Sequence, residues 1–278
     1  MIICTASFAL MNAFVKILDS LPTFEIVFFR ALGTVVITTP YLLLTSTPYF
    51  GIKRPMLFVR GVLGTISMVA FFMSMKYLSV GVAVSIRYLS PMFATMIAIV
   101  WMGERVRKIQ WLFYLTALTG VFIIKQFDLM FSSIGLLLGL ISAIFSGLVY
   151  VIVRSIGARE HPFVVVNYFM IVAMLVSGIL MIPSWVKPST GQWLFLLGLG
   201  VPGFIGQLYM TKALQSSSTS HIVPFKYTEV IFVLLISTLW LGETYSLLSL
   251  LGMMMVIIGM TANYLVSRKL NKSIDSVV

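Results

Sequence analysis

Apolar stretches of about twenty residues, separated by short polar segments, run through the whole chain. A helix rises about 1.5 Å per residue, so such a stretch crosses roughly 30 Å of hydrocarbon. Gly, Pro and Ser gather in the separators, as in residues 46–55 and 187–192. The first stretch starts almost at Met1 without a basic leader, unlike a cleavable signal peptide. The pattern predicts ten membrane-spanning helices and no domain outside the membrane: residues 2–18, 24–45, 56–75, 80–102, 109–125, 133–153, 162–183, 193–211, 221–241 and 246–266.

One eighteen-residue segment occurs twice in these stretches. Residues 87–104, RYLSPMFATMIAIVWMGE, recur as residues 226–243, KYTEVIFVLLISTLWLGE, with six identical positions. A basic residue leads each copy, Arg87 in the first and Lys226 in the second. Neither helix propensity nor lipid solubility requires a charge at these positions, so the repeat indicates a duplicated membrane protein.

The two copies lie in the fourth and ninth predicted spans, and five crossings invert the second copy relative to the first. Gly120 and Gly259 keep the same offset of 139 residues, so the match extends beyond the segment itself. Duplicated, inverted halves are common among secondary transporters, with the substrate held between them. We therefore predict an all-α integral membrane protein of ten transmembrane helices in a five-plus-five inverted repeat, with halves 1–127 and 128–278.

The composition agrees with a membrane protein and excludes several other classes. Hydrophobic residues make up 60% of the chain and charged residues 10%, whereas soluble domains carry about 25% charged residues. The single cysteine, Cys4, excludes an intrachain disulfide and a cysteine metal site. Two histidines are too few for a metal centre by themselves. The net charge of +11 is spread over short loops, so we expect no metal, no cofactor and no nucleic-acid partner.

The basic residues also predict the orientation in the membrane. Twelve fall on the face with both termini and four on the opposite face, which places both termini in the cytoplasm by the positive-inside rule. The five tryptophans lie at span ends, as an interfacial aromatic belt requires. We expect a multi-pass protein of the plasma or inner membrane. The twelve are Lys53, Arg54, Arg60, Arg105, Arg107, Lys108, Arg154, Arg159, Lys212, Arg268, Lys269 and Lys272, and the four are Lys16, Lys76, Lys125 and Lys187.

Charged residues inside the predicted spans are the first candidates for chemistry, because each costs roughly 2.5–3.5 kcal/mol near the bilayer centre. Arg87 lies about seven residues into its span, roughly 10 Å deep, and has no carboxylate close in sequence. Lys226 lies at a similar depth from the other side, with Glu229 at i+3, where the two can neutralise each other. Arg30 lies near Glu25 and is either a structural tie or a gate. The alternative for all of these is snorkelling to the interface.

Neutral polar residues within the spans can complete a pocket. Tyr88 and Tyr227 each follow one of the two repeated cations, which sets them above Asn12, Gln207 and Asn167. The alternative for each is an interhelical hydrogen bond, worth about 0.6 kcal/mol on average.

Proline and glycine interrupt three of the spans near the depth of the cations. The interruptions are Ser90-Pro91, Val201-Pro202-Gly203 and Pro224. They predict kinks, which suit moving helices beside a midplane site but also occur as ordinary packing kinks.

A Gly-Glu pair closes the fourth span of each half, as Trp101-Met102-Gly103-Glu104 and Trp240-Leu241-Gly242-Glu243. Together with the span count and the duplication, these ends resemble the EamA family of the drug/metabolite transporter superfamily over nearly the whole chain. The resemblance implies a proton-, exchange- or gradient-linked carrier of small metabolites, commonly an exporter of amino acids or related compounds. It also implies a central cavity lined largely by spans 1, 3, 4, 6, 8 and 9.

We therefore expect a secondary active transporter, an exporter or exchanger, of a small anionic or zwitterionic metabolite such as an amino acid or carboxylate. Sequence motifs for catalysis or nucleotide hydrolysis are absent, so we expect no enzyme. The expected partners are the solute, the bilayer and a coupling proton, and the oligomeric state is open. The expected substrate-binding residues are Arg87, Tyr88, Lys226, Tyr227, Gln207 and Asn12, and the expected coupling or gating residues are Glu229 and Arg30.

The alternative is a membrane protein without transport activity. It would be a binder, or a membrane-embedded enzyme that uses Glu229 and His221. Flux across a sealed bilayer distinguishes the two hypotheses.

Overall fold

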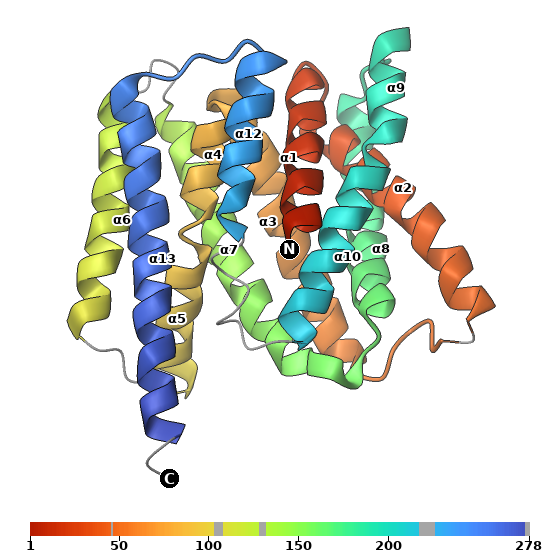
Figure 1. The fold of residues 1–278 in the computed structure, drawn as a ribbon. Coiled ribbons are helices and arrows are strands. Elements are labelled where there is room, and N and C mark those ends of the chain that lie inside the picture. Colours follow the sequence, from red (N-terminus) through yellow and green to blue (C-terminus); the bar gives the residue numbers. More distant parts are fainter. Residues whose placement is uncertain (46, 103–107, 128–131, 217–225, 276–278) are drawn as a thin grey trace.

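The computed structural model describes residues 1–45, 47–102, 108–127, 132–216 and 226–275, and every regular element in these ranges is helical (Figure 1). The helices are α1 (Ile2–Ile17), α2 (Thr23–Leu44), α3 (Arg54–Tyr77), α4 (Val80–Arg87), α5 (Ser90–Met102), α6 (Lys108–Phe127), α7 (Ser133–Ile156), η1 (Gly157–Arg159), α8 (Pro162–Met181), η2 (Ile182–Ser184), α9 (Thr190–Gly198), α10 (Gly200–Ser216), α12 (Thr228–Leu239) and α13 (Leu247–Asp275).

Eight helical stretches in the described ranges are long and apolar enough to cross a membrane. They overlap eight of the ten predicted spans, so the protein is an all-helical, multi-pass membrane protein. The first and ninth predicted spans fall on α1 and α12, which have only 16 and 12 residues. The ninth span was expected to begin at residue 221, and residues 217–225 lie outside the described part of the chain.

Both copies of the repeat have a turn at the tyrosine that follows the basic residue. Helix α4 ends at Arg87, and its C-terminal Tyr88 has φ −70° and ψ −4°. In the second copy Tyr227 precedes α12 with nearly the same angles, φ −69° and ψ −15°. The sequence predicts a kink at Ser90-Pro91, and Pro91 indeed lies in the first turn of α5, where a missing N–H costs nothing. Pro224 lies outside the described residues.

The predicted eighth span, residues 193–211, also forms two helices. Leu199 separates α9 from α10, three residues before Pro202. Proline has no N–H to donate to the carbonyl four residues earlier, here that of Gly198, and its ring crowds that carbonyl. The kink expected around Pro202 is therefore found as a helix break at Leu199.

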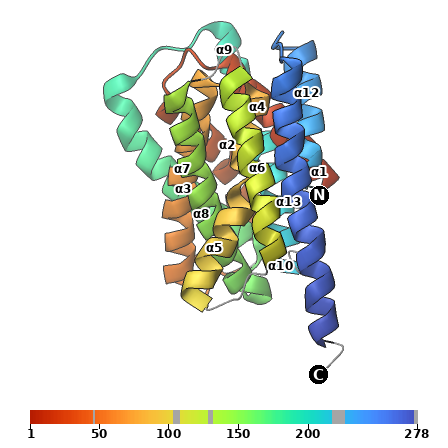
Figure 2. The ribbon, with the colours of Figure 1, turned by 90° about the vertical axis from the view of Figure 1, so that its left-hand side faces the viewer.

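Helices α6 and α13 lie side by side along one flank of the bundle (Figures 1 and 2). A Cβ placed on Gly120 would lie 2.5 Å from the carbonyl oxygen of Gly252, and one on Gly259 would lie 2.7 Å from that of Phe113. Only glycine permits such an approach, as in other small-residue helix contacts in membranes. The offset of 139 residues converts one of these contacts into the other.

The connections divide between the two ends of the bundle. Figure 1 shows the α2–α3 and α7–α8 connections and the C-terminus at the lower end, and the α12–α13 connection at the upper end. Helix α3 therefore runs upward and α4 runs downward, so their residues approach the middle of the bundle from opposite ends.

Candidate functional site

A cavity of about 90 Å³ lies inside the bundle. Side chains from α1, α2, α3, α4, α7, α8 and α10, together with Lys226, line it. The family resemblance implied spans 1, 3, 4, 6, 8 and 9, and the structure adds the second and seventh through Arg30 and Phe169. Pockets for small metabolites usually measure about 300–1,000 Å³. Helices or side chains must therefore move apart before a metabolite can fit.

Four of the lining side chains are basic: Arg30, Arg60, Arg87 and Lys226. None of the described residues that line the cavity is acidic. Such a concentration of positive charge in a low-dielectric interior favours an anionic occupant.

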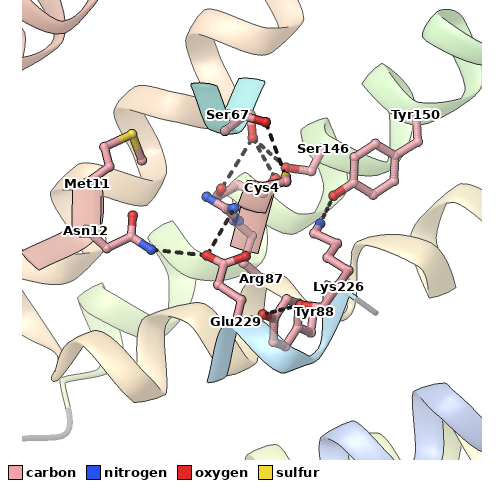
Figure 3. A network of polar contacts seen from close by, with 12 residues as sticks. Cys4, Met11, Asn12, Ser67, Arg87, Tyr88, Ser146, Tyr150, Lys226 and Glu229 are labelled. Carbon is pink, nitrogen blue, oxygen red and sulfur yellow. Dashed lines mark hydrogen bonds and ion pairs between the residues drawn. The ribbon is translucent and has the colours of Figure 1, made fainter. Parts of the chain in front are cut away.

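Arg87 pairs with a carboxylate from the other half of the chain (Figure 3). Its Nη2 lies 4.0 Å from Oε1 of Glu229, and its guanidinium lies over the ring of Phe71 at 4.0 Å from the centroid. Asn12 on α1 donates to the same Glu229 oxygen at 3.2 Å. The second oxygen of Glu229 has no hydrogen-bond partner among the described residues. The sequence near Arg87 contains no such carboxylate, because Glu229 is far from it along the chain and meets it only in the folded bundle.

The structure does not show the pairing of Lys226 with Glu229 that the i+3 spacing allows. Lys226 Nζ donates instead to the hydroxyl of Tyr150 on α7, and it lies 4.6 Å from the centroid of that ring (Figure 3). The i,i+3 rule needs both residues on one continuous helix. Here α12 begins only at Thr228, with Tyr227 as its N-cap, so Lys226 lies outside the helix that carries Glu229.

Tyr88 and Tyr227 connect the two copies of the repeat rather than line the cavity. The Tyr88 hydroxyl donates to the backbone carbonyl of Lys226 at 3.0 Å. The two rings meet edge to face, with centroids 5.1 Å apart and an interplanar angle of 85°. The contact between Tyr88 and Tyr227 holds the two copies of the repeat together. It thereby positions the neighbouring Arg87 and Lys226 in the cavity lining.

Arg30 lines the cavity but makes no tie to Glu25. Its Nε lies 3.1 Å from the sulfur of Met11, and Nη1 contacts the sulfur of Met68. Five residues on a helix rotate the side chain by about 140° from Glu25, whose carboxylate instead accepts from the backbone N–H of Val186 at 3.4 Å. Thioether sulfur is a weak acceptor, so Arg30 retains donor capacity.

Arg60 is a cavity residue that sequence reasoning missed. It was counted among the basic residues of the cytoplasmic face, yet it is only 2% exposed and lies in the second turn of α3. Its guanidinium lies 3.9 Å from the ring centroid of Phe169. The signal that could have found it is its place six residues beyond Arg54, inside an apolar stretch.

The remaining polar candidates divide between the cavity and the scaffold. Gln207 on α10 lines the cavity. Asn12 does not line the cavity and is connected to it only through Glu229 and Arg87. Asn167 accepts hydrogen bonds from Thr38 at 2.7 Å and Thr39 at 3.4 Å, so it ties α8 to α2. His221, which the alternative hypothesis needs, lies outside the described residues.

Comparisons with known proteins point to one family. The model of the EamA-like transporter family matches residues 1–126 and 133–265. The chain is 32% identical over 267 residues to the pseudopaline exporter CntI of Pseudomonas aeruginosa strain UCBPP-PA14, covering 94% of this chain and 93% of that protein. It is 26% identical over 254 residues to human solute carrier family 35 member G1, covering 85% and 70%.

The fold also resembles that of a solved structure. A crystal structure with 17% sequence identity superposes with a TM-score of 0.69, covering 96% of this chain and 98% of that chain. At this identity the likeness concerns the arrangement of the helices alone.

Proposed function

The chain belongs to the EamA-like transporter family, and from this we propose that it is a secondary transporter that exports or exchanges a small anionic or zwitterionic metabolite by alternating access. The family and the similar relatives are transporters, not enzymes. The observation that carries the proposal is the cavity with four basic lining residues and, among its described lining, no acidic one. The similarity to a pseudopaline exporter supports export as the direction.

Arg87 and Lys226 form the proposed acid-binding pair. Both side chains line the cavity, and they come from the two copies of the repeat. Arg87 offers a planar fork of N–H groups that matches a carboxylate or phosphate, and Lys226 adds a compact charge. Gln207, also in the lining, can hydrogen-bond another polar group of the substrate.

Glu229 is the proposed coupling group. It is fully buried and shares Arg87 with any incoming anion. A substrate acid that binds Arg87 displaces Glu229, and a proton taken up by the carboxylate then removes its unpaired charge. Substrate binding and proton uptake are linked in this way, because a buried carboxylate without a partner is unfavourable. Arg30, held by sulfur atoms between α1 and α3, is the proposed gate.

The proposed architecture is ten spans in a five-plus-five inverted repeat with halves 1–127 and 128–278. The two segments that the family model matches, the equivalent helix breaks at Tyr88 and Tyr227, and the paired glycine contacts between α6 and α13 support it. In this arrangement the protein lies in the plasma or inner membrane, and both termini lie in the cytoplasm.

Flux through proteoliposomes tests the proposed function. We expect wild-type protein to move small carboxylates or amino acids across the sealed membrane, and Arg87→Ala and Lys226→Ala each to reduce that flux at least tenfold. Each substitution removes a charge-assisted contact worth about 1.5–3 kcal/mol, or about tenfold to a hundredfold in affinity.

Lys212→Ala is the matched control, because Lys212 is exposed on α10 outside the cavity. It should keep the wild-type flux. Unchanged flux in both Arg87→Ala and Lys226→Ala would contradict the proposal, and binding without any flux would favour the non-transporting alternative.

A further inference from the structure

The cavity lining also contains Arg60, a basic residue that is not part of the proposed Arg87–Lys226 binding pair. Arg60 lines the cavity together with Arg30, yet its Nε and Nη1 have no hydrogen-bond partner among the described residues. No ion pair in the described part of the chain includes it. Burying a guanidinium without acceptors for its N–H groups costs free energy. A bound group from outside the protein that accepts these hydrogen bonds would lower that cost.

The surroundings hold the Arg60 side chain in place without neutralising it. The ring of Phe169 covers its guanidinium at 3.9 Å. Gly64, one turn further along α3, leaves the space that the side chain occupies, because a Cβ there would lie 2.6 Å from Nη1 and 2.8 Å from the Phe169 ring. This packing orients the guanidinium while Nε and Nη1 have no hydrogen-bond partner among the described residues, which is the arrangement of a built anion site.

The guanidinium groups of Arg87 and Arg60 lie beside different turns of α3 in the same cavity. Arg87 stacks on Phe71, whereas the Arg60 guanidinium lies beside Gly64, seven residues earlier on the same helix. Seven residues correspond to about 10 Å along the helix axis. Arg30 contacts Met68, between these two levels. One small acid group therefore cannot contact both Arg87 and Arg60.

We propose that Arg60, with Arg30 beside it, forms a second acid-binding subsite, so that the substrate is an elongated molecule with two separated acid groups. The inference rests on the proposed function and narrows it from anionic or zwitterionic solutes to diacids. One acid group binds between Arg87 and Lys226, and the other binds the guanidinium of Arg60. The carbon chain between the two acids lies along the apolar wall that Met68 and Phe72 contribute.

Binding of matched diacids and monoacids to the purified full-length protein tests this inference. The probes are adipate and hexanoate, which have equal chain length and differ by one acid group. We expect adipate to bind wild-type protein at least tenfold more tightly than hexanoate. Arg60→Gln should weaken adipate about tenfold to a hundredfold and leave hexanoate within about twofold of the wild type, whereas Arg87→Ala should weaken both.

Thermal stability without ligand separates a binding role from a structural one. Removing an unpaired buried charge relieves its desolvation cost, so Arg60→Met should raise the melting temperature of the unliganded protein by a few degrees. A merely structural arginine would lower it. Arg54→Gln is the matched control, since Arg54 is exposed on the same helix and should change neither property.

The outcomes distinguish this inference from the proposed function. If Arg87→Ala weakens adipate while Arg60→Gln binds it like wild type, the second subsite is wrong and the proposed function stands. If adipate and hexanoate both fail to bind, the diacid inference is contradicted, whereas the proposed function is contradicted only by the flux results for Arg87→Ala and Lys226→Ala. If inorganic phosphate stabilises wild-type protein but not Arg60→Gln, and adipate binds no better than hexanoate, Arg60 holds a small inorganic anion and the diacid inference is overturned.

Discussion

At the scale of single residues, the important electrostatic partners come from distant parts of the chain. The sequence allows Glu229 to neutralise its near neighbour Lys226, but Glu229 lies 4.0 Å from Arg87, which is 142 positions away in sequence (229 minus 87). Lys226 instead donates to Tyr150 on another helix. Glu229 is fully buried and Arg87 is 14% exposed. The carboxylate is therefore the member of the pair whose charge most needs its partner.

Glu229→Gln tests the coupling role at this scale. The neutral amide keeps the shape but leaves Arg87 without its counter-ion, so we expect a loss of stability of about 1–3 kcal/mol, measured as a lower melting temperature. The amide cannot take up a proton, so the dependence of flux on pH should flatten. The matched control is Glu25→Gln on α2, a carboxylate that is also buried but forms no ion pair with a cavity residue in the described part of the chain. A pH profile identical to wild type in Glu229→Gln would exclude this residue as the coupling group.

At the scale of elements, the Gly-Glu pair that ends the second repeat caps the N-terminus of α4. Gly242 has φ +67°, a left-handed conformation that other residues adopt only with strain. The turn aims Glu243 at the first N–H of α4, and both carboxylate oxygens accept from Val80 at 3.1 Å. A negative charge at a helix N-terminus stabilises the helix dipole.

Tyr245 completes this cap. Its hydroxyl donates to Glu243 at 2.5 Å and accepts from the N–H of Gly81 at 3.1 Å. Burial and the Glu243 carboxylate raise the pKa of Tyr245, so the hydroxyl stays protonated and able to donate. In this half, the motif that carried the family resemblance therefore ties α4 to the α12–α13 turn. Its counterpart Glu104 lies outside the described residues.

Glu243→Ala tests this cap. The substitution leaves the first N–H of α4, that of Val80, without its acceptor, so we expect a loss of about 1–2 kcal/mol, read as a lower melting temperature. Glu243→Gln keeps an acceptor without the charge and should lose about half as much. An unchanged melting temperature in Glu243→Ala would show that water replaces the carboxylate at this helix end.

At the scale of the whole molecule, the basic residues divide between the two ends of the bundle. Arg54 precedes the long body of α3 at the lower end of Figure 1, and Lys187 lies in the α8–α9 connection at the upper end. The larger number of basic residues assigned to the lower end predicts that this end faces the cytoplasm.

Labelling of single cysteines tests this orientation. With Cys4, the only cysteine, replaced by serine, Lys187→Cys should react with a membrane-impermeant maleimide in intact cells. Arg54→Cys should react only after permeabilisation. Both positions are exposed in the structure, so either can react once reached. The reverse pattern would invert the proposed orientation of the protein.

Much of the helical framework could be predicted because it depends on local properties. The length of each apolar stretch predicted where the eight long helices lie, and the prolines predicted where α4 and α9 end. The partners around the start of α12 are harder to predict: the i,i+3 spacing allows Lys226 to pair with Glu229, but the structure places Lys226 against Tyr150. A turn of one residue at Tyr227 does not change the hydropathy pattern along the chain, so the start of α12 could not be predicted from it.

The sequence by itself determined the membrane class, the family resemblance and the repeated basic positions Arg87 and Lys226, because length, composition and internal repetition can be read along one chain. Only the tertiary structure decided which groups meet. It paired Glu229 with Arg87, set Tyr88 against Tyr227 and turned Arg60 from an apparent surface charge into a lining residue of the cavity. The physical reason is that these contacts depend on how distant helices pack and rotate, and glycines such as Gly64 control that packing by leaving space rather than by adding a contact.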